Sequence, residues 1–280
     1  MMPEVTIVIV TYNSISDINN CLNSIYKFTP GTDTFEIIVI DNASEDDTAA
    51  AVRNYCKAKS NISLICNAEN RGYTKANNQG IEASKGKFIF LLNPDIIFVE
   101  SSIDILISRM KEIKADAIAP QLINPDWTVQ PSCRTFPKYR DILFEFLQFS
   151  MIFRRNKFLS RWKMEYFGHD HEMEVEQPMA AALLIKTEVL KKIGNFDERF
   201  VMFFNDVDLC KKIYDSGFKI YFTAATKMIH LKGTSVYKDR KRMIKIWNVD
   251  CLSYFKKYYD NLIPYNLLKA GLFISSFVRK

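Results

Sequence analysis

The sequence has no paired cysteine motif and no membrane-spanning run. Its six cysteines are scattered, none in the C-x-x-C spacing of zinc and redox sites, so we expect reduced thiols, most of them in the core. Residues 5–10 already have the pattern of a strand, which leaves no room for a secretory leader. The C-terminal stretch 262–280 is interrupted by Pro264 and Lys269 and falls short of the roughly 20 apolar residues that a span needs. We therefore expect a cytoplasmic protein.

Glycine-rich nucleotide loops are also missing. No G-x-G-x-x-G follows the first predicted strand, which argues against dinucleotide-dependent redox chemistry. Residues 11–14 contain no basic triphosphate loop, which argues against a nucleotidyltransferase. The 38 Lys and Arg against 32 Asp and Glu give a net charge of +6, which suits nucleotides or acidic lipid headgroups. Nucleic-acid binding has only this charge behind it, and we expect no nucleic acid partner.

Strand and helix patterns alternate in the first half of the chain. Short apolar runs predict strands at 5–10, 35–40, 62–66 and 88–92, and amphipathic patterns predict helices at 18–28, 48–58 and 73–83. Ser44 is positioned to cap the N-terminus of the second helix. Right-handed crossovers then give a largely parallel sheet with helices on both faces. With 280 residues, we expect an α/β domain with an appendage.

The second half is less regular. Periodicity fails from 127 to 177, where an aromatic and basic stretch covers 139–167. Order resumes with strands predicted at 178–185 and 219–222, another ending at His230, and helices at 188–193 and 205–216. Basic helices then follow over 237–259 and 262–280. The aromatic and basic stretch and these helices favour peripheral contact with an anionic membrane, and core packing of the aromatics is the alternative.

The strand at 88–92 ends abruptly in Asn93-Pro94-Asp95. Proline cannot continue the ladder, so Asp95 should lie at the carboxyl edge of the sheet, where open α/β sheets bind ligands. A carboxylate there can hold a divalent cation against a diphosphate. The same tripeptide at Asn124-Pro125-Asp126 follows only a brief apolar run, and a simple turn explains it.

Polar residues also follow the first three strands. Thr11-Tyr12-Asn13 and Asp41 should share one crevice, where Tyr12 can stack on a base and the carboxylate can accept an imino proton. Helix capping by Asn13 and Asp41 is the alternative. The loop around Arg71 could face a phosphate, or Arg71 could be an ordinary surface residue.

The last group of candidates lies beyond residue 194. Asp206 would open a helix with its carboxylate directed into a cleft, as a general base requires, while Asp208 points elsewhere. The alternative is that Asp206 and Asp208 only complement the dipole of this helix from its first turn. His230 ends a strand and could be a ligand or structural. His169 and His171 have charged, aperiodic neighbours, which favours a solvated loop over a metal site.

The ordered motif set resembles the family 2 glycosyltransferases, and within them the rhamnosyltransferase-like members of bacterial polysaccharide assembly. The similarity covers about residues 5–235, and several motifs in the correct order are far more specific than any one. The motifs that carry it are Val8-Ile9-Val10-Thr11-Tyr12-Asn13, Val39-Ile40-Asp41-Asn42-Ala43-Ser44, Asn70-Arg71-Gly72, Leu92-Asn93-Pro94-Asp95, Gly194-Asn195-Phe196-Asp197-Glu198, Asn205-Asp206-Val207-Asp208-Leu209 and His230.

This resemblance implies the GT-A fold, a Rossmann-like nucleotide-binding sheet with helices on both faces, followed here by a helical C-terminal appendage. It implies a GT-A domain over 1–235, with a nucleotide-binding half over 1–120 and an acceptor-binding half over 121–235, and a basic, apolar segment over 236–280. The implied reaction moves a sugar, rhamnose or another hexose, from a nucleoside diphosphate donor to a hydroxyl of a glycan or lipid-linked acceptor, with inversion. We then expect the protein to act at the inner face of the cell membrane.

The resemblance also implies residue roles. Asp206 matches the catalytic base, and Asp95 and His230 match ligands of a divalent cation, Mn²⁺ or Mg²⁺. Asp208 is a candidate for acceptor binding. The positions that match donor binding are Thr11, Tyr12, Asn13, Asp41, Arg71 and Asn93.

Two positions depart from the common family pattern. Asn93 replaces the first acid of the Asp-x-Asp metal motif, as in the rhamnosyltransferase-like subgroup, and Asn205 replaces the first acid of Glu-Asp-x-Asp. Cation binding should therefore depend on the donor diphosphate, with the imidazole favouring Mn²⁺ over Mg²⁺. A catalytically weakened nucleotide- or carbohydrate-binding module is the alternative function.

Overall fold

The computed structural model describes residues 2–29, 35–231, 240–259 and 261–278. Its first half is a parallel sheet wrapped by helices, as the sequence predicts. The strands β1 (Val5–Thr11), β2 (Phe35–Asp41), β3 (Ile62–Cys66) and β4 (Phe88–Leu92) lie in the order β3-β2-β1-β4. The connecting helices are α1 (Ile15–Phe28), α2 (Thr48–Ala58) and α3 (Tyr73–Ala83). Helix α2 is capped at Asp47, so the predicted Ser44 cap is wrong.

Beyond β4 the sheet is mixed, so the parallel arrangement predicted and found for the first half does not continue through it. It continues in the order β4-β11-β6-β12-β5, and β11 (Ala182–Lys186) runs antiparallel to both β4 and β6 (Ala117–Ile123). No regular crossover helix joins these strands through the aperiodic 127–177 region, so nothing in the local pattern fixes their direction. The remaining strands are β5 (Ile96–Phe98), β7 (Val129–Gln130), β8 (Cys133–Arg134), β9 (Met173–Glu174), β10 (Gln177–Pro178) and β12 (Ile220–His230).

Three predicted strands have different bounds in the structure. The single strand expected over 178–185 is two, β10 and β11, because Pro178 pairs in a separate two-stranded sheet with β8. The strands expected at 219–222 and before His230 form the single strand β12 instead. Its pairing with β6 shifts register between Thr223 and Lys227, and this irregularity divides the apolar pattern that sequence reading depends on.

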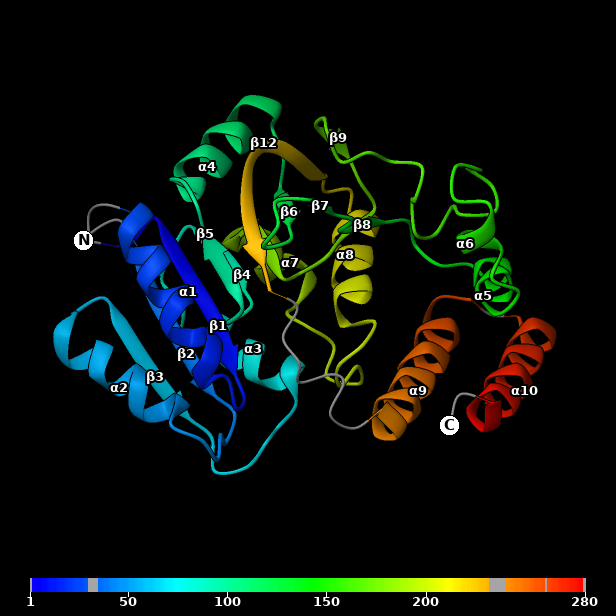
Figure 1. Cartoon of the computed structure of the whole chain (residues 1–280), viewed down its shortest axis with the longest axis horizontal. Helices are drawn as coiled ribbons and strands as arrows, with labels where there is room; N and C mark the ends of the chain where they lie inside the picture. Colours follow the sequence, from blue (N-terminus) through cyan, green and yellow to red (C-terminus); the bar gives the residue numbers. More distant parts are fainter. Residues whose placement is uncertain (1, 30–34, 232–239, 260, 279–280) are drawn as a thin grey trace.

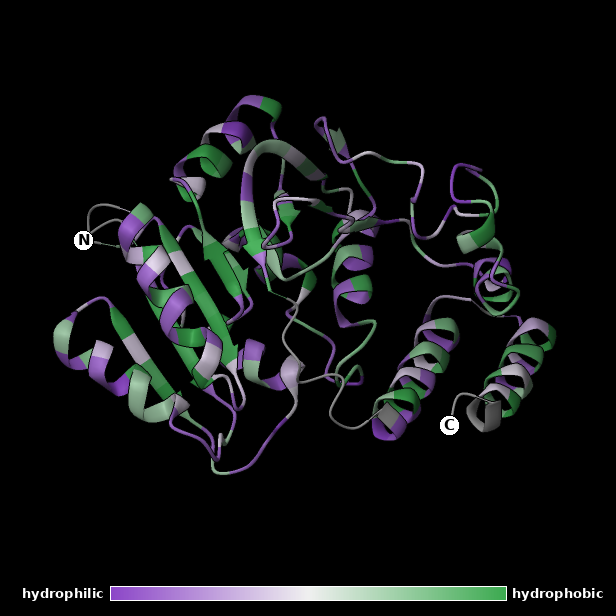
Figure 2. Cartoon of the chain, in the orientation of Figure 1, coloured by the Kyte–Doolittle hydropathy of each residue, from purple (hydrophilic) through white to green (hydrophobic). Residues whose placement is uncertain are grey.

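Helices cover both faces of the sheet (Figure 1). One hydrophobic core joins the sheet to α1, α2 and α4 (Ser102–Ile113). The other joins it to α3, α7 (Thr187–Ile193), α8 (Asn205–Asp215) and the C-terminal helices. The strands of the first half are almost uniformly hydrophobic in Figure 2, as expected for strands buried on both faces.

The C-terminal helices α9 (Arg240–Tyr258) and α10 (Leu262–Val278) lie beside α5 (Tyr139–Phe146) and α6 (Phe149–Ile152) at one end of the molecule (Figure 1). Helix α9 contributes Cys251, Tyr254 and Phe255 to the core, all with no exposed surface. Among the described residues, no helix is both long and apolar enough to cross a membrane.

Candidate active site at the carboxyl edge of the sheet

Strand pairing brings Asp95 and His230 together from distant parts of the sequence. The turn at Asn93-Pro94-Asp95 leads directly into β5, which pairs antiparallel with the end of β12 so that Ile96 lies opposite His230. The His230 Nε2 lies 3.5 Å from Asp95 Oδ1, and both side chains are buried. These two predicted metal ligands therefore form one cluster at the edge of the sheet.

Gln130 on β7 orients the imidazole. Its Oε1 lies 2.6 Å from His230 Nδ1, and its own Nε2 donates to Asn124 Oδ1 at 3.0 Å. Because an amide oxygen only accepts, Nδ1 donates to Gln130, and this hydrogen bond turns Nε2 toward Asp95. This is the arrangement typical of a ligating histidine. Sequence analysis missed Gln130, since a two-residue strand leaves no periodic signal.

The donor set suits a hard or borderline divalent cation. One carboxylate and one neutral imidazole are ligands that Mn²⁺ accepts and that Mg²⁺ accepts less readily. No cluster of three His, Cys, Asp or Glu side chains able to hold a metal occurs in the part of the chain that the structure describes. Asp95 and His230 could therefore hold a cation only with further oxygen ligands, such as those of a diphosphate.

The Asn-Pro-Asp turn is braced by α3. Tyr73 Oη donates to Asn93 Oδ1 at 3.2 Å, and the Asn93 backbone N donates to Ala181 O at 2.8 Å. Burial raises the pKa of Tyr73, and the negative charges of Asp206 and Asp95 raise it further. Tyr73 thus lies within the electrostatic reach of both acids, although their sequence positions are more than 100 residues apart.

Asp206 lies at the first turn of α8. Its Oδ1 accepts a hydrogen bond from the Val207 backbone N at 2.8 Å, and its Oδ2 accepts one from Gln177 Nε2 at 2.9 Å. Burial raises the pKa of Asp206 above its ordinary value, and Arg134 opposes that shift. A carboxylate with a raised pKa accepts a proton more readily, which is what a general base needs. Gln177 and Arg134 were also missed by sequence analysis.

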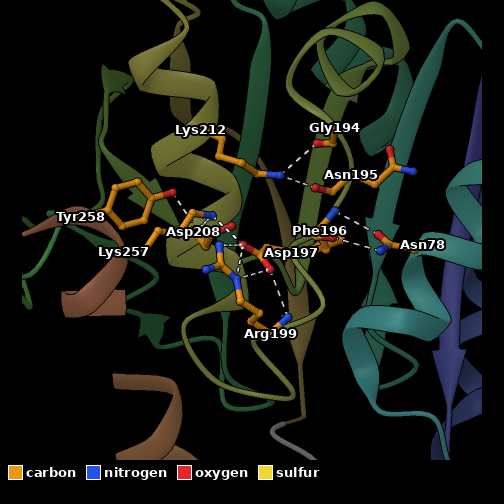
Figure 3. Close-up of polar contacts among 10 residues, drawn as sticks. All are labelled: Asn78, Gly194, Asn195, Phe196, Asp197, Arg199, Asp208, Lys212, Lys257 and Tyr258. Carbon is orange, nitrogen blue, oxygen red and sulfur yellow. Dashed lines mark hydrogen bonds and ion pairs between the residues drawn. The ribbon is translucent and has the colours of Figure 1, made fainter. Parts of the chain in front are cut away.

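Asp208 lies on another side of α8 and is fully buried. Its Oδ1 accepts hydrogen bonds from Lys257 Nζ at 2.5 Å and from Tyr258 Oη at 2.7 Å (Figure 3). Burial and the Asp208 charge raise the pKa of Tyr258. These contacts support a structural role for Asp208, and its acceptor-binding role stays a prediction.

The predicted base-binding residues form a network between two loops. Asp41 is buried and accepts hydrogen bonds from Thr11 Oγ1 at 3.2 Å and from the Ser44 backbone N at 3.1 Å. Asn13 Oδ1 accepts the Glu45 backbone N–H at 2.8 Å. Neither Asn13 nor Asp41 is a helix cap, because α1 and α2 are capped at other residues. Tyr12 is 40% exposed, so part of its side chain is accessible to a ligand.

The Arg71 loop is shaped by two asparagines. Asn42 Oδ1 accepts the Arg71 backbone N–H at 3.0 Å, and Asn70 Oδ1 accepts the Gly72 backbone N–H at 3.0 Å. Gly72 has φ +83° immediately before α3, a conformation that favours glycine. The Arg71 side chain is exposed at this loop. Asn42 positions the loop, a role that sequence analysis did not assign.

The two histidines at 169 and 171 differ. His169 is buried, and its Nε2 accepts the backbone N–H groups of Ser132 and Cys133 at 3.1 Å, so the expected solvated loop is wrong for this residue. Burial lowers its pKa. His171 is exposed beside Asp170, as expected.

The second Asn-Pro-Asp tripeptide, at Asn124-Pro125-Asp126, forms a simple turn, as predicted. The Trp127 backbone N donates to Asn124 O at 2.9 Å and closes it.

The fold is of the GT-A type: a mixed sheet with helices on both faces. It carries an acid after β4, a histidine at the end of β12 and an acid opening α8. The model of glycosyl transferase family 2 matches residues 6–164, and the chain belongs to that family. The protein is therefore a glycosyltransferase, and the resemblance in the sequence is confirmed.

Two curated relatives are similar over most of this chain. The N-acetylglucosaminyl-diphospho-decaprenol L-rhamnosyltransferase of Mycobacterium tuberculosis is 26% identical over 253 residues, which cover 85% of this chain and 80% of the relative. The low-salt glycan biosynthesis hexosyltransferase Agl10 of Haloferax volcanii is 23% identical over 235 residues, covering 82% and 68%.

Solved structures confirm the GT-A fold. A mannosyltransferase of Pyrobaculum calidifontis, in complex with GDP-Man and Mn²⁺, matches with a TM-score of 0.62 at 18% identity, covering 99% of this chain and 70% of that one. TarS of Staphylococcus aureus, in complex with UDP-GlcNAc, matches with a TM-score of 0.60 at 17% identity, covering 98% and 73%.

Proposed function

We propose that this glycosyltransferase moves a sugar from a nucleoside diphosphate donor to an acceptor hydroxyl with inversion at the anomeric carbon. One observation carries the proposal: Asp95 lies 3.5 Å from His230, and Asp95 and Asp206, far apart in the sequence, both lie near enough to Tyr73 to raise its pKa. The carboxyl edge of the sheet, where Asp95 lies, is where open α/β sheets bind their ligands. The raised pKa of Asp206 gives the cluster a base.

The first-half loops would bind the donor nucleotide. Tyr12 stacks on the base. The buried Asp41 carboxylate has lone pairs left to accept a hydrogen bond from an N–H group of the base. Asn13 holds the second loop in place, and Thr11 holds the Asp41 carboxylate. Arg71, exposed on a loop that ends at the N-terminus of α3, pairs with a phosphate.

Asp206 performs the proton transfer. It takes the proton of the acceptor hydroxyl while that oxygen attacks the anomeric carbon from the face opposite the departing diphosphate, which inverts the configuration. Asp95 and His230 would hold Mn²⁺ or Mg²⁺, and when bound the cation would neutralise charge on the leaving diphosphate. Asn93 occupies the position where many family members carry an acid. It accepts a hydrogen bond from the Tyr73 hydroxyl, which holds the turn in place.

The acceptor is a glycan or lipid-linked glycan. The name of the Mycobacterium tuberculosis relative includes a diphospho-decaprenol acceptor and a rhamnosyl donor group. By similarity, we propose a hexose such as rhamnose as the transferred sugar and the inner face of the cell membrane as the place of transfer.

The test is donor turnover by purified full-length protein. A panel of nucleoside diphosphate sugars with UDP, dTDP and GDP bases is incubated with Mn²⁺, and released diphosphate is measured with and without a lipid-linked glycan acceptor. We expect Asp206→Asn to reduce turnover about 10²- to 10⁴-fold, while the diphosphate still raises the melting temperature of the variant.

Two outcomes contradict the proposal. If wild type binds a diphosphate but turns over none of the donors, the protein is a binding module of the kind expected from Asn93 and Asn205. If Asp206→Asn retains near-normal turnover, Asp206 is not the base. Chelation with EDTA should stop turnover, and restored activity with Mn²⁺ is the matched control.

A further inference from the structure

Exposed hydrophobic side chains gather at one end of the molecule. Among the described residues, 12 of the 18 exposed large hydrophobic side chains lie in two segments, 143–158 and 249–274. The two segments are neighbours, since a Cβ added at Gly271 of α10 would lie 3.8 Å from the Phe146 ring of α5. Such clustering marks an interaction surface. The twelve residues are Leu143, Leu147, Met151, Ile152, Phe153, Phe158, Val249, Leu262, Ile263, Leu267, Phe273 and Ile274.

A groove runs between α9 and α10 within this surface. It has a volume of about 910 Å³, and its apolar lining includes Val249, Leu252 and Phe273. Lys241 and Lys245 of α9 and Lys269 of α10 also line it. The groove is therefore apolar and is lined by three lysines as well. This combination complements a lipid, since the apolar lining suits alkyl chains and the lysines suit an anionic headgroup.

The charge of the two helices has one sign on the outside. Across α9 and α10 the only acid is Asp250, which is fully buried. Its carboxylate accepts the backbone N–H groups of Met202 at 3.2 Å and Phe203 at 2.8 Å. No acid of either helix is therefore available to offset the lysines, and the charged side chains that the two helices expose are all basic.

From this arrangement we infer that α9 and α10 dock this protein on an anionic lipid surface, with the lysines at the phosphate level and apolar side chains of α10 among the acyl chains. Exposed apolar side chains flanked by lysines favour a position in the plane of the interface without crossing it. Each lysine near an anionic leaflet adds favourable electrostatic free energy, so three of them together with the exposed apolar area suffice for reversible binding.

A second copy of this chain fits the surface less well. A two-fold dimer would place the same patch against itself, so Lys241, Lys245 and Lys269 would face their equivalents in a low-dielectric interface. Like charges in that position oppose association. The inference does not depend on the transferase chemistry, because liposome binding is measured without donor or acceptor.

The experiment is flotation of the full-length protein with liposomes of phosphatidylcholine alone and with about 30% phosphatidylglycerol. We expect binding only to the anionic liposomes and a loss of binding at high salt. The triple variant Lys241→Glu, Lys245→Glu and Lys269→Glu should weaken partitioning about 100-fold, from roughly fivefold for each lysine.

A matched control carries the same charge change elsewhere. Lys57, Lys85 and Lys87 are exposed in the first half of the fold, and changing all three to Glu should leave more of the anionic binding intact than the α9–α10 triple. A second variant, Leu267→Ser with Phe273→Ser, removes apolar contact without altering charge and should also release the protein from liposomes. Neither residue is buried, so folding is preserved.

Three outcomes overturn the inference. One is equal loss of binding in the two charge triples, which would mean that net charge alone drives association. Another is failure of the wild-type chain to float with anionic liposomes. The third is a dimer by light scattering that Leu267→Ser with Phe273→Ser dissociates, since a second copy would then cover this surface.

Discussion

Lys257 joins α9 to the loop and helix that carry the proposed base, and its replacement tests that connection. Its Nζ lies 2.8 Å from Asp197 Oδ2 and 2.5 Å from Asp208 Oδ1 (Figure 3). Asp208 is fully buried, and its second oxygen has no hydrogen-bond partner among the residues that the structure describes. Lys257→Met would therefore remove the ammonium group that contacts the buried Asp208 carboxylate and leave the Tyr258 hydroxyl hydrogen-bonded to it.

The expected loss in the free energy of unfolding is about 3 kcal/mol. Removing one partner of a buried ion pair costs about 3–5 kcal/mol, and the lower end applies because Lys257 is 18% exposed and Tyr258 retains its hydrogen bond. For a chain of this size, 1 kcal/mol corresponds to about 2–4 °C, so the melting temperature should fall by about 6–12 °C. Thermal and urea unfolding of the purified variant measure both quantities.

Lys256 is the matched control, because it is the next residue on α9 and is exposed. Lys256→Met should change stability by no more than about 0.5 kcal/mol. In the Lys257→Met background, Asp208→Asn should recover part of the loss, because it removes the uncompensated charge. Equal stability of Lys256→Met and Lys257→Met would refute the reasoning, as would a double variant less stable than Lys257→Met alone.

Three further predictions concern the site and the core. Gln130→Ala should raise the Mn²⁺ concentration needed for half-maximal turnover about 10- to 100-fold, because the imidazole that it orients would rotate freely. Burial raises the pKa of Asp206 in the folded state above its value in the unfolded chain. Ionised Asp206 therefore destabilises the fold, and this cost grows as the pH rises from the unfolded pKa to the folded pKa. Asp206→Asn should consequently melt at a higher temperature than wild type at pH 8 and not at pH 4. Gly80→Ala should destabilise the protein by about 1–3 kcal/mol, because the new methyl would lie 2.4 Å from Val8 Cγ1, whereas Gly271→Ala meets nothing closer than 3.8 Å and serves as control.

The first half of the fold follows from local sequence rules. Continuous apolar runs of five to seven residues alternate with amphipathic patterns, and each βα step fixes the direction of the next strand. Asp95 could be placed at the carboxyl edge for the same reason, since proline ends the strand before it. Its role as a metal ligand was inferred from that position and from the family resemblance, and it remains a proposal.

The second half depends on pairings between distant segments that no local pattern announces. That His230 meets Asp95 requires β12 to lie beside β5, which in turn requires β11 to enter the sheet antiparallel between β4 and β6. Gln130 reaches His230 from a strand of two residues. Polar residues that act through one such contact have no periodicity, and only the three-dimensional structure identifies them.

Helix α9 connects the two proposals physically. Its inner face holds the loop before α8 through Asp250 and the start of α8 through Lys257, while its outer face lines the basic groove. The predicted boundary at residue 235 stays a prediction, but a helix with Tyr254 and Phe255 fully buried belongs to the same core as α8. A lipid surface bound at the groove therefore contacts the same helix that positions Asp208, two residues from the proposed base, so removing α9 should cost both membrane binding and transfer.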